Sequence, residues 1–87
     1  MCKKLIKLAM DDLKDSGMLA DYAKEAKGTE WEAFYTNRLK QRMREFEEDK
    51  EWLHKAMMDD KDHVWHHLEG YLDEAMDRIR WGMGLRA

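Results

Sequence analysis

Proline is absent from all 87 residues of the chain, and β-branched residues are scarce. Proline interrupts helices more strongly than any other residue, so no position carries that interruption. Strands favour β-branched side chains, whereas the abundant residues here are alanine, leucine, methionine, lysine, glutamate and arginine, which favour helices. The sequence therefore predicts an all-α protein. Its β-branched residues are Ile6, Thr29, Thr36, Val64 and Ile79.

Cysteine and long apolar runs are also nearly missing. Cys2 is the single cysteine, which excludes an intramolecular disulfide. No apolar run approaches the roughly 18 residues that a membrane-spanning helix needs. The apolar stretch near the start is interrupted by Lys7 and ends at Asp11, so it does not match a signal peptide. We therefore expect a cytoplasmic protein with no membrane contact.

The chain also lacks a strong excess of either charge, with 16 basic and 19 acidic residues. A net charge of −3 provides no bulk attraction for nucleic acid, and it is too small for an imitation of DNA by dense carboxylates. Basic residues are flanked by acidic ones, so nucleic-acid binding ranks last among the function classes. We expect the placement of charge to matter more than its sum.

The length leaves room for a single domain, covering 1–87. We divide it into one or two short helices within 1–28 and a long antiparallel helical hairpin over 29–87. Gly17 and Gly28 are expected to end the two short helices, because glycine readily adopts the left-handed conformation that closes a helix.

Two apolar stripes define the arms of the predicted hairpin, over 29–58 and 59–81. Thr29 and Glu32 fit a capping box that opens the first arm. The aspartates within 58–62 can each cap a new helix, but nothing there forbids a continuous one, so both alternatives stay open. The stripes comprise Trp31, Tyr35, Leu39, Met43, Phe46, Leu53 and Met57, with Lys50 on the same face, and Trp65, Leu68, Leu72, Ala75, Ile79 and Met83.

The length of the first arm suggests self-association. An arm of about 28 residues is roughly 42 Å long, whereas a compact chain of this size is about 30 Å across. A second copy that covers the overhanging apolar positions is therefore our expectation, and a homo-oligomer results. The alternative is a kinked four-helix monomer closed by the N-terminal helices.

Arginines gather at one level of the predicted hairpin. A fold near residues 59 and 60 places Arg38 near Trp81 and Arg42 near Asp77. Guanidinium groups suit phosphate, and an indole ring suits a stacked base, so this level is a candidate site for a phosphate-bearing ligand such as a nucleotide. The candidate ligand-binding residues are Tyr35, Asn37, Arg38, Gln41, Arg42, Arg78, Arg80 and Trp81.

Two plainer interpretations of these arginines carry more weight. They can be solvated faces with ordinary ion pairs, such as Glu74 with Arg78 four residues later. They can also form a subunit contact with an acidic stripe of the second arm, which comprises Glu69, Asp73 and Asp77.

Histidines gather near the predicted turn. His63 and His67 are four residues apart, the spacing at which two imidazoles on one helix share a metal, and His54 is a candidate third ligand. The glutamate of helical zinc hydrolases is missing, so a metal site is the third-ranked hypothesis. No glycine-rich phosphate loop or di-iron Glu-x-x-His spacing occurs, which predicts a protein that is not an enzyme and has no cofactor.

No motif identifies a family. In size and layout alone the chain is similar to the compact helical accessory proteins of phages and mobile elements, many of which bind and inhibit host proteins. We expect a non-enzymatic, oligomeric binding protein of that type, which binds and blocks a host protein. The alternatives are sequestration of a nucleotide-like anion at the arginine level and metal binding at the histidine-rich turn.

Overall fold

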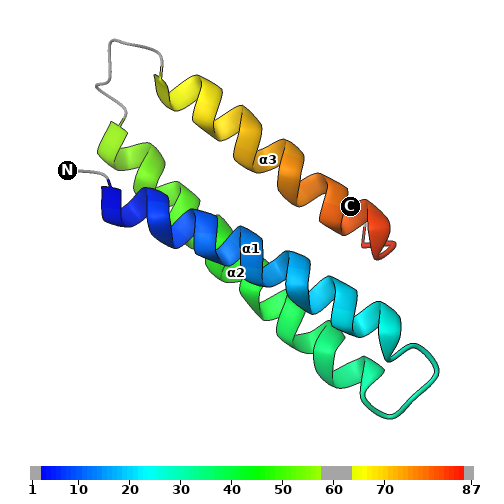
Figure 1. Ribbon diagram of the computed structural model, residues 1–87. Helices are drawn as coiled ribbons and strands as arrows, with labels where there is room; N and C mark the ends of the chain where they lie inside the picture. The colour runs from blue at the N-terminus through cyan, green and yellow to red at the C-terminus, as the bar shows by residue number, and fades with distance from the viewer. Residues whose placement is uncertain (1–2, 58–63, 86–87) are drawn as a thin grey trace.

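The described residues form three helices packed side by side (Figure 1). The computed structural model describes the backbone of residues 3–57 and 64–85, and the side chains of 3–57 and 67–85. The helices are α1 (Lys3–Glu25), α2 (Glu32–Met57) and α3 (Val64–Gly82). Successive helices run in opposite directions (Figure 1). The all-α prediction is confirmed, and the molecule is elongated, measuring 49 × 20 × 17 Å.

The N-terminal part is one long helix, so the prediction of short helices ended at Gly17 was wrong. Gly17 lies inside α1. A Cβ atom placed on Gly17 would lie 3.9 Å from Cδ1 of Ile79 in α3, so the two helices are close at this point. Ser16 beside it is fully buried. Small residues let neighbouring helices approach closely, so packing outweighs the modest helix-breaking tendency of a single glycine.

The connection between α1 and α2 follows the predicted chemistry closely. Gly28 has a φ of 82°, in the left-handed region that glycine favours. The Thr29 hydroxyl accepts a hydrogen bond from the Trp31 amide at 3.2 Å, and the Glu32 carboxylate accepts one from the Gly28 amide at 3.1 Å. This is a variant of the predicted capping box, displaced by one residue at each contact.

The most extensive helix contact joins α1 to α2, whereas α3 contacts α2 over few residues. The predicted hairpin of α2 with α3 is therefore not the pair around which the molecule is organised. Its predicted turn at 58–62 falls outside the described residues. The long α1 covers α2 along most of its length, the role that the sequence argument gave to a second copy.

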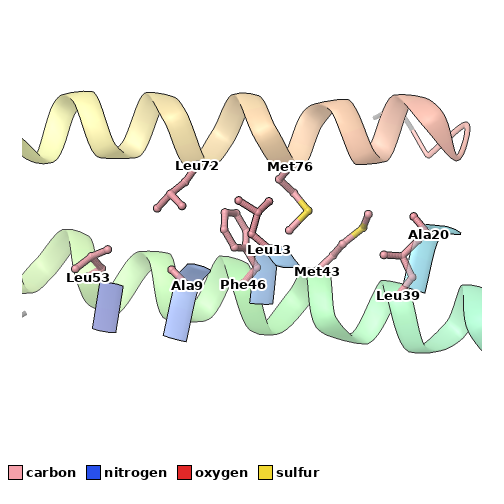
Figure 2. Close-up of a cluster of buried hydrophobic side chains, with 9 residues drawn as sticks. All are labelled: Ala9, Leu13, Ala20, Leu39, Met43, Phe46, Leu53, Leu72 and Met76. Carbon is pink, nitrogen blue, oxygen red and sulfur yellow. The ribbon is translucent and has the colours of Figure 1, made fainter. Parts of the chain in front are cut away.

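The hydrophobic core lies between all three helices (Figure 2). Leu39, Phe46 and Leu53 of α2 are fully buried, as the predicted stripe requires, and so is Leu72 of α3. Trp31 departs from the prediction because 55% of its surface is exposed. No helix in the described part of the chain is both long and apolar enough to cross a membrane.

The end of α3 is a defined cap. The Leu85 amide donates to the Arg80 carbonyl at 2.8 Å, and the Gly84 amide donates to the Trp81 carbonyl at 3.1 Å. With Gly84 at a φ of 69°, this is a Schellman motif, which satisfies the last carbonyl groups of the helix. Leu85 thereby packs against the core.

Candidate functional site

The arginines that were predicted to lie at one level of a hairpin belong to two separate helix contacts: Arg42 to that between α1 and α2, and Arg80 to that between α2 and α3. Lys50 pairs with Asp73, and Nδ1 of His54 lies 3.6 Å from Oε2 of Glu69. These pairs shift α3 by about one helical turn from the predicted register. Arg42 is directed toward α1, where its Nη2 lies 2.8 Å from Oδ1 of Asp12.

The arginines of α3 form pairs of their own. Arg80 contacts Glu47 of α2 at 2.8 Å and Asp77 at 2.8 Å. Arg78 pairs with Glu74 at 2.8 Å, as the plainer interpretation of the sequence predicted. Trp81 is 66% exposed. None of these three α3 residues lines the hollow in which Arg38, Gln41 and Arg42 meet, which is formed by α1 and α2.

The remaining predicted ligand-binding residues lie near the start of α2. Tyr35 belongs to a cluster of aromatic rings, and Asn37 is exposed. Gln41 hydrogen-bonds to Glu45 at 3.4 Å. The predicted set is thus brought together in part, on α2 alone.

Of the three histidines in the predicted metal site, the structure describes the side chains of His54 and His67. His63 lies outside the described residues, and His67 is exposed on α3. Within the ranges described, no group of three histidine, cysteine, aspartate or glutamate side chains is arranged to hold a metal ion.

The principal surface feature is a groove between α1 and α2, which we call the acidic groove. Two adjoining hollows of about 390 and 650 Å³ form it, and they share Asp15, Met18, Arg42 and Glu45. All its lining residues belong to α1 and α2, and α3 packs elsewhere on this pair (Figure 1). They are Leu8, Asp11, Asp12, Lys14, Asp15, Met18, Leu19 and Tyr22 of α1, and Arg38, Gln41, Arg42, Glu45, Glu48 and Asp49 of α2.

Negative charge predominates in the acidic groove. Six carboxylates line it against three cations, a surplus that equals the net charge of −3 of the whole chain. One of those cations is already engaged, because Arg42 contacts Asp12 and Asp15 at 2.8 Å and Glu45 at 2.6 Å. Glu48 and Asp49 form no ion pair with any residue that the structure describes. The groove therefore attracts cations more strongly than anions.

Asp12 is the buried acid of the acidic groove. It is 3% exposed, and its Oδ2 has no hydrogen-bond partner among the described residues when the carboxyl is ionised. Burial, together with a hydrogen bond and the negative charge of Asp49, raises the pKa of Asp12 to about 7 from 3.8; Arg42 opposes this rise and Glu45 adds to it. A proton on Asp12 supplies the hydrogen bond to Asp49.

An aromatic tip closes one end of the acidic groove. The ring centroids of Trp31 and Phe34 are 5.8 Å apart, those of Phe34 and Tyr35 are 5.2 Å apart, and those of Tyr35 and Tyr22 are 5.5 Å apart. The Arg38 guanidinium lies 5.6 Å from the Phe34 ring centroid. This end of the α1–α2 pair projects beyond the end of α3 (Figure 1), so α3 does not cover it.

Sequence reasoning missed the acidic groove, although part of its signal was visible. Asp12 and Ser16 fall on the same three- and four-residue steps as Ala9, Leu13 and Ala20, which are buried. Polar residues on an apolar helix stripe are candidates for a buried polar cluster. Their partners on α2 were not visible, because no local pattern sets the register of α1 against α2.

Comparison of the chain with protein-family models, with curated proteins and with solved structures gives no match. The proposals that follow therefore rest on the groove and the tip alone.

Proposed function

We propose that this protein is a non-enzymatic helical binding protein, of the phage accessory or inhibitor type, that acts by binding and blocking a host protein. The aromatic tip is the observation that carries the proposal. Tyr22, Trp31 and Phe34 are 45–55% exposed, although the core between the helices is complete without them. Tryptophan, tyrosine and arginine are the residues that contribute most to protein–protein affinity, and here they are adjacent.

A capture experiment with matched variants tests the proposal. The wild type, a Trp31→Ala/Phe34→Ala variant and a Tyr71→Ala control are immobilised and exposed to host-cell extract. Tyr71 is a suitable control because it is 56% exposed on α3, away from the tip. A protein that is retained is then purified, and its Kd for each variant is measured.

We expect the tip variant to bind the purified partner at least about tenfold more weakly than the wild type, and the control to bind normally. Equal retention by all three proteins contradicts the proposal, as does the absence of any protein retained above a blank surface.

Sequestration of a phosphate-bearing ligand is the second candidate function. Arg38, Gln41 and Arg42 line one hollow beside the Tyr22 ring, which supports it. Asp15 and Glu45 line the same hollow and already neutralise Arg42, which is why we rank it second. The test is a thermal shift with nucleotides: stabilisation that Arg38→Ala abolishes favours this function, and no stabilisation by any nucleotide eliminates it.

Self-association remains part of the proposal. A native mass spectrum of the gently purified protein, compared with its denatured mass, measures it directly. An integer multiple of the chain mass supports an oligomer, and a bare monomer removes it.

A further inference from the structure

We propose that the acidic groove receives a basic amphipathic helix of the partner protein. This inference rests on the proposed function and specifies the chemistry of the partner. The shape of the groove, its apolar side chains and its charge support it.

The shape of the acidic groove suits a helix. Two antiparallel helices leave a furrow on each side of their contact. The lining of the groove belongs to α1 and α2 alone, and α3 packs elsewhere on the pair (Figure 1). From Leu8 to Tyr22 the groove is about 21 Å long, the length of a helix of roughly 14 residues. A docked helix would pack against α1 and α2 on a side of the pair that α3 does not occupy.

Apolar side chains along the groove supply anchoring contacts. Leu8, Met18 and Tyr22 are 45–47% exposed, and they lie on one face of α1. Amphipathic helices bind such grooves through apolar residues at three- and four-residue steps. Methionine adapts its shape to different partners, which suits the middle of a docking surface.

The charge of the groove determines the sign of the partner. Asp11 and Asp15 alternate with the apolar residues of α1, and Glu48 faces the same hollow from α2 without an ion pair to any described residue. Lysine and arginine beside the apolar anchors of the partner would complement these carboxylates. Nucleic acid and acidic peptides would be repelled.

Fluorescence anisotropy with model helices tests the inference on the full-length protein. The probe is a labelled peptide of about 14 residues, with leucine at three- and four-residue steps and lysine elsewhere. One control peptide keeps the leucines and replaces lysine with glutamate. A second has the composition of the probe but a scrambled order that destroys the apolar face.

The chain offers two matched pairs of variants. Met18→Ala removes a groove residue, and Met10→Ala makes the same change on α1 outside the groove lining. Glu48→Lys reverses a groove charge, and Glu74→Lys makes the same reversal on α3, where the Glu74 side chain is 69% exposed. Circular dichroism establishes that each variant is folded.

We expect the basic amphipathic peptide alone to bind, and more weakly as salt rises from about 0.05 to about 0.5 M. Met18→Ala and Glu48→Lys should each weaken binding about fivefold or more, with Met10→Ala and Glu74→Lys unchanged. Equal binding by the scrambled peptide, or equal effects within either matched pair, overturns the inference. So does a dimer that the groove variants dissociate, because a second copy would then occupy the groove.

This test fails separately from that of the proposed function. If the tip variant loses a captured partner while the basic peptide does not bind, only the groove inference is overturned. If the wild type and the tip variant retain the same host proteins, the proposed function is overturned whatever the peptide does.

Discussion

Replacing Asp12 with asparagine should stabilise the protein, and by more as the pH rises. Asparagine keeps the shape of a protonated aspartate, and its amide nitrogen can donate to Asp49 as the proton on Asp12 does. Unlike aspartate, it never acquires a negative charge inside the α1–α2 contact. The variant therefore isolates the effect of the ionisation of Asp12.

The direction follows from the pKa of Asp12, which is raised to about 7 in the folded protein against 3.8 ordinarily. Below pH 3.8 the carboxyl is protonated in both the folded and the unfolded chain, and its full contribution to stability is present. Between these values only the folded protein keeps the proton, so stability falls as the pH rises. Above about pH 7 both states are ionised and the loss is complete.

The magnitude follows from the same two values. A difference of about three pKa units corresponds to a total loss on the order of 4 kcal/mol. The interval from pH 5 to pH 7 covers about two of these three units, because only the folded protein keeps the proton there. The free energy of unfolding of Asp12→Asn should therefore exceed that of the wild type by an amount that grows by about 2–3 kcal/mol from pH 5 to pH 8.

Urea unfolding at fixed ionic strength, followed by far-ultraviolet circular dichroism at pH 5, 6, 7 and 8, measures this gap. The other groups around Asp12 are Asp15 on α1 and Arg42, Glu45 and Asp49 on α2, and their contributions largely cancel in the comparison. Asp21→Asn, an exposed change on α1, is the control and should show no growing gap. A gap for Asp12→Asn that stays constant from pH 5 to pH 8 would refute the reasoning.

Three further predictions concern stability. Arg42→Met should lower the free energy of unfolding by about 2–4 kcal/mol, because it leaves clustered carboxylates without a cation; adding Asp12→Asn should restore part of this in urea unfolding. Gly70→Ala should raise the melting temperature, because no atom lies within 4 Å of the new Cβ and alanine favours a helix over glycine by about 1 kcal/mol. Gly28→Ala should lower the melting temperature, because the φ of 82° at this position is strained for alanine. Trp31→Ala should change the free energy of unfolding by less than about 0.5 kcal/mol, and a larger loss would show that the aromatic tip is structural.

The helix class and most of the core were predictable because both depend on local composition and periodicity. Leu39, Met43, Phe46 and Leu53 follow the helical period, and each is buried as that period requires. The continuity of α1 through Gly17 was not predictable in this way. It depends on the packing of α1 against α2 and α3, which local composition does not specify.

The candidate site was less predictable than the core. Arg42 was predicted to lie near Asp77, but it pairs with Asp12 and Asp15 of α1, and these partners depend on how α1 aligns with α2. Lys50, which interrupts the apolar stripe of α2, forms an ion pair with Asp73 of α3. Burial lowers the pKa of Lys50, yet hydrogen bonds with Asp73 and Glu47 outweigh it and raise the pKa overall.

The pairs that join α2 to α3 also imply a response to salt. Lys50 with Asp73 and Arg80 with Glu47 bridge the two helices through the ends of long side chains, whereas α1 and α2 are in close contact. Ionic bridges weaken with salt, whereas the apolar contacts of Leu72 and Met76 in the shared core do not. Salt should therefore loosen the polar edge between α2 and α3 while the α1–α2 pair, which carries both the groove and the tip, stays in place.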